Sequence, residues 1–353
     1  MSGRSRNGIG LLANLLLLVV AVVSTVAIVE LASRAYARRN RPDVGFSPAE
    51  QTAIVDQVPD YGYALPANRA LHVVKHNPDG SVCYDVTYRT DAFGRRTLGQ
   101  SYDPSHPHLI LFGCSVTMGE GLDDADTLAA QLSGRLPGYN VYNYGVHGYG
   151  PQHTLAKLQA GTVPSEVVSG RGIAVYSLLP VHISRAIGDS RAFWIYGSPY
   201  YRLDGDATLR REGSFETGRP YMTALYRNFA ELRAHSWFLS LVDVGLPFRL
   251  SDSDADLTAR ILEQARAEYR AQFTGEFYVV FHPTWARRYP EIAHLLDVMR
   301  RHLVSAGVPV LDYSTDAGLT AEEQIDHGCD PHPDGRLNAE LAQRLARDVG
   351  GVP

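Results

Sequence analysis

The sequence predicts an α/β protein, a three-layer α/β/α domain built on a parallel sheet and preceded by one N-terminal transmembrane helix. Two observations support this fold class. Residues 9–29 form an uncharged, mostly aliphatic run, and from His108 onward short apolar runs alternate with stretches of helical periodicity. Strands that alternate with helices are typical of βαβ units, whose strands pair in parallel and whose helices cover both faces of the sheet.

Each element of this domain is predicted from its own pattern. Apolar runs indicate five strands, at 109–112, 141–144, 173–179, 277–281 and 308–313. Periodic stretches indicate five helices, at 127–136, 151–158, 257–273, 291–306 and 337–349. Residues 82–89 alternate like a short strand, which indicates a small β element in front of the main domain.

The chain divides into four parts on this basis. We expect an N-terminal tail at 1–8, a transmembrane signal anchor at 9–30, a juxtamembrane segment with a small β element at 31–105, and the main domain at 106–353. An aromatic, Arg-rich and Gly-punctuated stretch without clear periodicity indicates an insertion at 193–250. Such insertions carry substrate contacts or a lid in some proteins and are decoration in others.

The apolar run is long enough to cross the hydrocarbon core of a bilayer as a helix. A cleaved signal peptide is the alternative, but its apolar region is normally about 7–15 residues long. A sequence like a cleavage site at 35–37 is flanked by Arg34 and Arg38. We therefore expect an uncleaved anchor. The arginines after the run would place the following domain in the cytoplasm by charge alone, although this rule weakens when a large domain follows.

Charge and cysteine content exclude several classes of protein. The net charge is −5, and residues 1–41 hold six arginines and one glutamate, so the remaining chain is strongly acidic. This argues against a nucleic-acid-binding surface. Of the three cysteines, at least one lacks an intrachain partner, and no CxxC pair is present. Cys114 and Cys329 each precede a candidate catalytic residue. A disulfide between them is conceivable, but buried free cysteines are the commoner case.

Ser115 is the strongest candidate for a catalytic residue. It follows the apolar run 109–112 in a Gly-rich turn, and open α/β sheets place their chemistry at the carboxyl ends of strands. A serine hydroxyl is a poor nucleophile until an imidazole accepts its proton, and the imidazole needs a carboxylate to orient it. His332 and Asp330 can supply both from one loop, with Asp326 as an alternative carboxylate.

Backbone amides can complete this site. A developing oxyanion needs donors, and the N–H groups of Ser115 and Gly145 are candidates because glycine lets the backbone approach closely. The competing interpretations are a helix N-cap for Ser115 and simple turn residues for Gly145 and Asp330.

Other polar and aromatic residues receive weaker assignments. The set His327, Cys329, Asp330 and His332 resembles a ligand cluster, but its spacing matches no standard zinc pattern. We therefore expect no metal and no cofactor. His147 and His153 are expected at the rim or on the surface. The aromatic residues of the insertion are expected to pack within it rather than bind sugar or lipid: Trp194, Tyr196, Tyr200 and Tyr201.

Three blocks in order carry a family resemblance: Gly113–Ser115, Asn143–Gly145 and Asp330–His332. Over about residues 106–350 the chain resembles the SGNH (GDSL-type) hydrolases, and in particular their membrane-anchored bacterial branch. The resemblance implies a three-layer, flavodoxin-like fold and ester chemistry. It also implies that Ser115 is the nucleophile, His332 the base, Asp330 its orienter and Gly145 an oxyanion donor.

The resemblance further implies a single-pass protein of the cell inner membrane, with its catalytic domain in the periplasm or outside the cell. The expected partners are the membrane and an ester or acylated glycan substrate. The expected function is a serine esterase that works through an acyl-enzyme. An O-acyltransferase that modifies an envelope glycan, and a non-catalytic glycan-binding protein of the same fold, are the alternatives.

Two departures from the family pattern stand out. Cys114 replaces the aspartate that usually lies between the glycine and the serine. The asparagine expected after the third strand is missing, and His182 takes about its place. An imidazole N–H can replace one amide donor. We therefore expect an oxyanion hole formed by Ser115, Gly145 and His182.

Overall fold

The computed structural model describes residues 4–40, 55–77, 79–283, 292–315, 319, 324–326 and 329–350, with the backbone alone described at 4–12, 40 and 324–326. The first residue of the helix predicted at 291–306 and His327 lie outside the described residues. So do residues 41–54 of the predicted juxtamembrane segment and residues 1–3 of the predicted tail.

A parallel sheet of five strands forms the centre of the domain, in the order β11-β10-β7-β5-β6. The strands are β5 (His108–Gly113), β6 (Asn140–Gly145), β7 (Arg171–Leu178), β10 (Thr274–Phe281) and β11 (Val310–Asp312). Because β6 and β7 lie on opposite sides of β5, the chain reverses its winding direction there. Open sheets hold their ligands at such a point. Ser115 directly follows β5.

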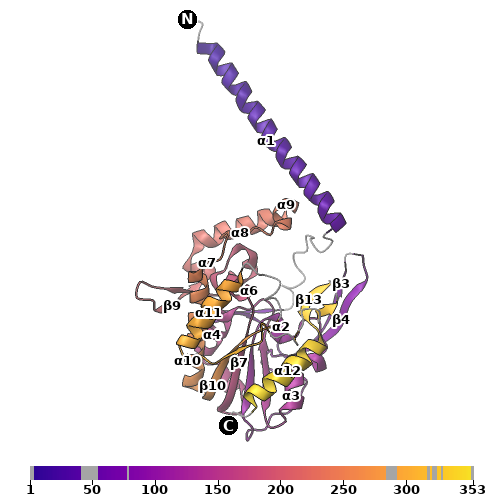
Figure 1. The fold of residues 1–353 in the computed structure, drawn as a ribbon, viewed down its shortest axis with the longest axis vertical. Coiled ribbons are helices and arrows are strands. Elements are labelled where there is room, and N and C mark those ends of the chain that lie inside the picture. The colour runs from indigo at the N-terminus through magenta and orange to yellow at the C-terminus, as the bar shows by residue number, and fades with distance from the viewer. Residues whose placement is uncertain are drawn as a thin grey trace.

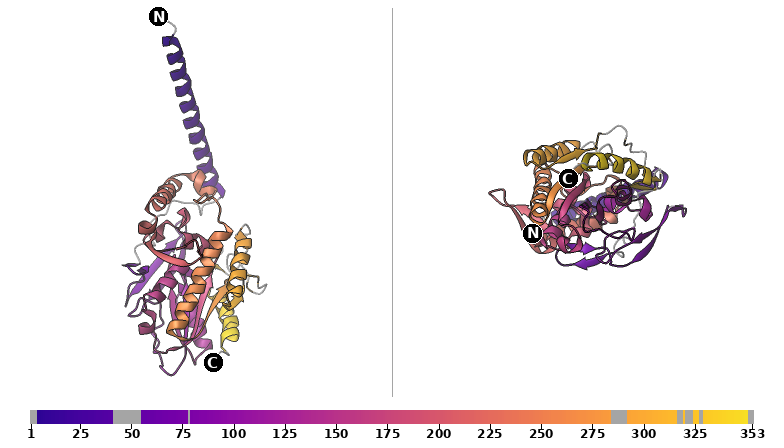
Figure 2. Two further views of the ribbon diagram at one scale, coloured as in Figure 1. Left: turned by 90° about the vertical axis from the view of Figure 1, so that its left-hand side faces the viewer. Right: turned by 90° about the horizontal axis from the view of Figure 1, so that it is seen from below.

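Helices cover both faces of this sheet, which confirms the predicted three-layer fold (Figure 1 and Figure 2). One face carries α3 (Leu128–Arg135) and α12 (Gly335–Val349). The other carries α4 (Pro151–Gln159), α6 (Val181–Ile187), α10 (Asp252–Gln272) and α11 (Ala293–Ser305). In β5, Leu109 and Leu111 face the first pair of helices, while Ile110 and Phe112 face the second group. A strand buried on both faces explains the continuous apolar run in the sequence.

One helix, α1 (Arg4–Asn40), leaves the domain at one end (Figure 1). It extends beyond both ends of the predicted span 9–30. It is long and apolar enough to cross a membrane, and the side chains of residues 13–29 are all exposed.

Two small antiparallel sheets follow the gap after α1. The first pairs β1 (Asp56–Val58) with β2 (Gly62–Ala64), and the second pairs β3 (Ala70–His76) with β4 (Val82–Arg89). Tyr63, Val86 and Tyr88 from this region pack in one apolar cluster with Val116 and Met118. Both of these partners belong to α2 (Ser115–Met118), so the segment before the main domain packs directly on the turn that carries the candidate nucleophile.

The insertion between β7 and β10 has secondary structure of its own. It contains η3 (Ser190–Ile195), β8 (Pro199–Leu203), β9 (Leu209–Ser214), α7 (Phe215–Gly218), α8 (Pro220–Ala234) and α9 (Trp237–Leu241). Tyr196 and Tyr201 are fully buried, as expected for packing, whereas Trp194 is partly exposed. The remaining short elements are η2 (Asp124–Asp126), α5 (Val163–Glu166), β12 (Gln324–Asp326) and β13 (Asp330–Pro333).

Two expectations about single residues were wrong. Cys329 forms a disulfide with Cys83 on β4, with the two Cα atoms 6.0 Å apart, while Cys114 is a buried free cysteine. The sequence offers no spacing rule for a pair separated by 246 positions. His147 and His153 are buried rather than on the rim or surface. Ser198 of the insertion and Tyr63 of β2 contact His153, and Tyr88 and Glu120 contact His147.

Gly145 makes the tightest backbone approach next to the candidate nucleophile. A Cβ atom there would lie 2.3 Å from the Met118 amide nitrogen and 2.9 Å from the Cys114 carbonyl oxygen. We therefore predict that Gly145→Ala destabilises the domain by about 1–3 kcal/mol in urea unfolding, because neither backbone can yield without moving α2. Gly134→Ala in α3 is the matched control. A Cβ there meets nothing within 4 Å, so its effect should be neutral or stabilising by up to about 1 kcal/mol. Equal stability of both variants would contradict the close packing.

Candidate active site

The site is built first on the turn between β5 and α2. The strand ends at Gly113 and the short helix begins at Ser115, whose side chain is buried. A Cβ at Gly113 would lie 2.1 Å from Thr117 Oγ1, so glycine is needed for the chain to turn this sharply. As the first residue of α2, Ser115 has an amide N–H that no carbonyl within the helix can accept.

The structure brings Ser115, His332 and Asp330 into one hydrogen-bonded chain. Ser115 Oγ lies 2.8 Å from His332 Nε2, and His332 Nδ1 lies 2.5 Å from Asp330 Oδ1. This is the order in which a nucleophile, a base and an orienting carboxylate must be connected. Asp330 and His332 both lie on β13, which begins directly after the disulfide-bonded Cys329.

Asp330 is held from three directions. Its Oδ1 accepts hydrogen bonds from the backbone N–H and the ring Nδ1 of His332, and its Oδ2 lies 2.6 Å from Lys75 Nζ on β3. Burial raises the pKa of Asp330, but the bonds from His332 and Lys75 outweigh burial and keep the pKa below its ordinary value. Asp330 is therefore a carboxylate. Asp326, the alternative from the sequence, lies on β12, and its side chain is outside the described residues.

A second carboxylate, Glu120, adjoins the base and was missed in the sequence. It is buried, and its Oε2 lies 3.4 Å from His332 Nε2 and 2.8 Å from His147 Nδ1. Burial raises the pKa of Glu120, but the two histidines outweigh burial and hold the pKa well below its usual range. Its position five residues after Ser115, in the same Gly-rich turn, was the available signal. Nothing in the sequence distinguishes it from the neighbouring acidic residues.

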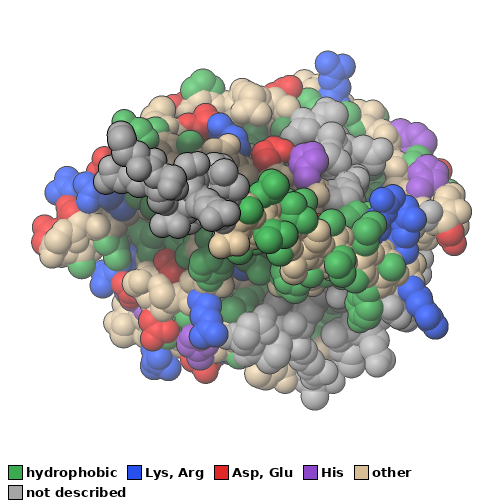
Figure 3. Space-filling model, turned by 90° about the horizontal axis from the view of Figure 1, so that it is seen from above, with side chains coloured by type: hydrophobic (Ala, Val, Ile, Leu, Met, Phe, Trp, Pro, Cys, Tyr) green, Lys and Arg blue, Asp and Glu red, His purple; other side chains and the backbone are tan. Residues whose placement is uncertain are grey.

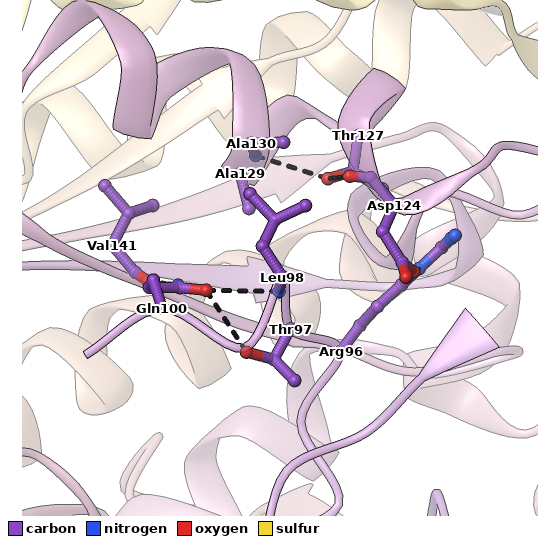
Figure 4. Close-up of a pocket in the computed structure, with 9 residues that line it drawn as sticks. All are labelled: Arg96, Thr97, Leu98, Gln100, Asp124, Thr127, Ala129, Ala130 and Val141. Atoms are coloured by element: carbon purple, nitrogen blue, oxygen red, sulfur yellow. Dashed lines mark hydrogen bonds and ion pairs between the residues drawn. The ribbon is translucent and has the colours of Figure 1, made fainter. Parts of the chain in front are cut away.

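Arg96 fixes the loop that carries Glu120. Its buried guanidinium donates to the carbonyl oxygens of Met118, Gly119 and Leu122 and pairs with Asp124 at 3.0 Å. Beside this ion pair lies a small, shallow pocket (Figure 4). None of the residues lining the pocket is a candidate catalytic residue: Arg96, Thr97, Leu98, Gln100, Asp124, Thr127, Ala129, Ala130 and Val141.

The surroundings of His332 change the pKa of its imidazole in opposing directions. Burial lowers the pKa of His332, but the charge of Glu120 and the hydrogen bond and charge of Asp330 outweigh burial and raise the pKa above its ordinary value. Lys75 acts in the opposite direction. The protonation state of His332 therefore depends on two carboxylates and one ammonium group.

The candidate oxyanion donors are arranged differently from the expectation. The Gly145 amide donates to Asn143 Oδ1 at 3.0 Å, so it is engaged in this structure. Asn143 Nδ2 in turn donates to the Thr117 carbonyl, and this ties β6 to α2. A role for Gly145 at an oxyanion requires the bond to Asn143 to open.

His182 is buried in the turn after β7. Its Nδ1 accepts a hydrogen bond from the Leu179 amide at 3.3 Å and lies 2.9 Å from the Tyr176 hydroxyl. The ring proton therefore belongs on Nε2, which has no partner among the described residues. Burial and the charge of Arg185 hold the pKa of His182 far below its ordinary value, so the ring is neutral. Its role as an oxyanion donor stays a prediction.

Glu120, Asp330 and His332 also meet the minimum requirement for a metal site, because one ligand atom from each lies within 4.8 Å of the others. Those atoms already bind one another, and the ammonium group of Lys75 contacts Asp330. A cation would have to displace or repel that ammonium group. The donor set is better explained as a charge network around an imidazole.

No family model matches this chain, and no curated protein sequence matches it. Solved structures of similar fold include a lipolytic protein of the G-D-S-L family from Veillonella parvula. It is 12% identical and covers 69% of this chain and 97% of its own, with a TM-score of 0.40. The acetylxylan esterase Axe2 from Geobacillus stearothermophilus is 13% identical over 70% of this chain and 95% of its own, with a TM-score of 0.38.

The esterase AlinE4, of the SGNH-hydrolase family, is also 13% identical. It covers 72% of this chain and 97% of its own, with a TM-score of 0.34. These are proteins of the kind that the sequence motifs resemble.

The charges around His332 give a prediction for the pH dependence of any reaction that uses it as a base. The neutral imidazole must accept the Ser115 proton, so activity falls as the pH drops through the raised pKa of His332. We expect the acid limb of kcat/KM to lie above the ordinary value of 6.5. Glu120→Gln removes a charge that raises this pKa, so its acid limb should move to lower pH.

Lys75→Met is the matched control, because it removes a charge that lowers the same pKa. Its acid limb should move to higher pH. The measurement is a pH profile of kcat/KM on p-nitrophenyl acetate for the three proteins. Shifts of both variants in the same direction would contradict the charge network.

Proposed function

We propose that the chain is a membrane-anchored serine esterase of the SGNH type, which hydrolyses an ester through an acyl-enzyme. The hydrogen-bonded chain from Ser115 through His332 to Asp330 is the observation that carries this proposal. If Ser115 were only a helix N-cap, it would need no histidine beside it. If His332 were only a surface histidine, it would need neither the serine nor a buried carboxylate.

The reaction follows from the order of these groups. Ser115 Oγ transfers its proton to His332 Nε2 and attacks the ester carbonyl carbon, which forms a tetrahedral oxyanion. When the ester C–O bond breaks, the imidazolium gives its proton to the leaving alkoxide and Ser115 remains acylated. Water then gives a proton to His332, attacks the acyl carbon and releases the carboxylic acid, with the proton returned to Ser115.

Asp330 keeps His332 in the productive tautomer, because it accepts the hydrogen bond from Nδ1 and leaves Nε2 free to act as the base. Glu120 adds a second negative charge beside the imidazolium that forms during the attack. The first donor to the oxyanion is the Ser115 amide. Gly145 and His182 are proposed as further donors, the former after release from Asn143.

The anchor and the disulfide support a location outside the cytoplasm. The exposed apolar face of α1 matches a membrane span in length and composition. Disulfides persist in oxidising compartments and are rare in the cytosol. A domain that carries the Cys83–Cys329 bond therefore fits the periplasm or the cell exterior, opposite to the side that the arginines alone would favour.

Ser115→Ala tests the proposed chemistry. We predict that it lowers kcat on p-nitrophenyl acetate by roughly 10⁴- to 10⁶-fold and abolishes labelling by a fluorophosphonate probe, while thermal unfolding is unchanged. Ser133→Ala on α3 is the matched control and should retain activity and labelling. Wild-type turnover by Ser115→Ala would show that the nucleophile is wrong. A wild-type protein that neither labels nor hydrolyses any ester of a panel would favour a non-catalytic glycan-binding role.

Acyl transfer to a sugar hydroxyl would use the same residues and differ only in the acceptor. Release of free acid in the absence of glycan supports hydrolysis. Turnover that requires an added glycan, with the acyl group recovered on the sugar, would show that the protein is an O-acyltransferase rather than an esterase.

A reporter fusion tests the orientation. We predict that alkaline phosphatase fused after Pro353 is active, because it folds only outside the cytoplasm, and that the protein stays with membranes in a high-salt wash. If the alkaline phosphatase fusion is inactive and a fluorescent protein that folds only in the cytoplasm is active at the same position, the proposed orientation is wrong. Release of the protein by salt would show that α1 does not anchor it in the membrane.

A further inference from the structure

Large apolar side chains are exposed on the second half of the insertion, which does not contribute to the active site. They belong to α8, to α9 and to the loop after α9, and together we call them the α8–α9 surface: Tyr221, Met222, Leu225, Leu232, Phe238, Val242 and Phe248. The exposed fraction is 91% for Tyr221 and 71% for Phe248. Apolar patches of this kind mark sites of contact with another protein or a membrane.

On α8 these side chains share one face with the exposed Asn228. Tyr221, Leu225 and Leu232 lie at positions i, i+4 and i+11 of the helix, which point in nearly the same direction, and Met222 borders them. The opposite face carries the buried residues Thr223 and Ala230, and α8 packs there on η3 and α7. The helix therefore has one face packed on the domain and a second, exposed apolar stripe on the side away from it.

A specific contact sets the position of α9 relative to α1. The Glu30 carboxylate accepts hydrogen bonds from the Ser236 hydroxyl and from the Trp237 amide, the latter at 2.8 Å. Glu30 thus caps the N-terminus of α9, and it is the residue at which the apolar run of α1 ends. The start of α9 is thereby held at the level where α1 would leave the hydrocarbon core.

We propose that the α8–α9 surface docks on the interfacial layer of the same bilayer that α1 spans. The inference rests on the membrane anchor of the proposed function and adds a second attachment to the same bilayer. Amphipathic helices that lie in the interface bury an apolar face of this composition at the boundary between headgroups and acyl chains. Trp237 and Phe238 then lie where aromatic side chains concentrate in membrane proteins.

Continuity with α1 favours the bilayer over another occupant. Figure 3 looks onto the end of the molecule from which α1 projects, and the exposed apolar side chains of α1 cross the centre of this view. Both views from the side place α8 and α9 at this end, beside the base of α1 (Figure 1 and Figure 2). A bilayer that covers the exposed residues 13–29 of α1 therefore reaches the level at which α9 is capped.

Basic side chains accompany this boundary. Arg34, Arg38 and Arg39 are exposed on the last turns of α1, and Arg249 is exposed next to Phe248. Cationic side chains just outside the apolar zone can reach lipid phosphates while their aliphatic stems stay near the acyl chains. Their position after the span and beside the apolar stripe fits anionic headgroups.

Quenching of a fluorescent label in full-length protein tests the proposal. The chain is reconstituted in vesicles of phosphatidylethanolamine and phosphatidylglycerol and labelled with nitrobenzoxadiazole at Leu225→Cys or Leu232→Cys. Leu17→Cys reports the span, and Glu340→Cys on α12 reports a solvent-exposed helix. The unsubstituted chain, with Cys114 buried and the other cysteines bonded, gives the background. Quenchers are a nitroxide on a shallow acyl position and aqueous iodide.

We expect the nitroxide to quench the Leu225→Cys and Leu232→Cys labels several-fold more than the Glu340→Cys label, and iodide to quench them several-fold less. A Tyr221→Cys label should become open to iodide when Leu225→Glu and Leu232→Glu are added, with turnover of a soluble ester unchanged. This second variant changes only exposed positions.

Three results would overturn the proposal. If the Leu17→Cys label is lipid-quenched but the α8 labels respond to iodide like Glu340→Cys, the anchor stands and the docking is wrong. If the Leu17→Cys label is itself open to iodide, both the anchor and the docking are wrong. If the α8 labels are shielded from both quenchers, a protein or a second copy of the chain covers the surface.

Discussion

One hydrogen bond, from Ser115 to His332 Nε2, joins segments 217 positions apart, and the rest of the architecture serves to keep its two ends together. The serine is fixed by the end of a central strand that is buried on both faces. The histidine lies outside this sheet, on the short strand β13, which pairs with β12. Its position depends on contacts from outside the sheet: Lys75 on Asp330 and the Cys83–Cys329 disulfide. Both contacts come from the β3–β4 hairpin, so a segment in front of the main domain completes the site.

The electrostatics of the site show a trade-off. A serine esterase needs an imidazole basic enough to take the hydroxyl proton and acidic enough to return it to the leaving group. With Asp330 on one ring nitrogen and Glu120 near the other, the imidazolium is strongly favoured. Lys75 offsets part of this effect, and His147 occupies the other side of the Glu120 oxygen. The arrangement keeps the pKa of His332 above its ordinary value while both carboxylates stay buried with partners.

The sequence predicted the parts of this structure that depend on local patterns. The five strands were found because both faces of a parallel sheet are apolar, and Ser115 because a strand that ends in Gly-Cys-Ser produces a sharp turn. Glu120, Lys75 and Cys83 were not found. The roles of Lys75 and Cys83 arise from contacts across about 250 positions, and Glu120 is one acidic residue among several similar ones, so neither leaves a spacing pattern. In the insertion, short helices and a hairpin alternate too quickly for a period to emerge. In α8, apolar side chains lie on the exposed side of the helix as well as towards the domain, which weakens its periodic pattern.

The disulfide also has a consequence for the life history of the protein. A newly made chain in a reducing cytosol lacks the bond, so the strand that carries Asp330 and His332 then keeps the Lys75 ion pair but not the covalent link to the hairpin. If the domain is exported as proposed, oxidation of Cys83 and Cys329 locks the general base beside the serine only after the chain has left the compartment in which it is made. The order of biosynthesis and oxidation would thereby separate cytosolic esters from the fully linked site.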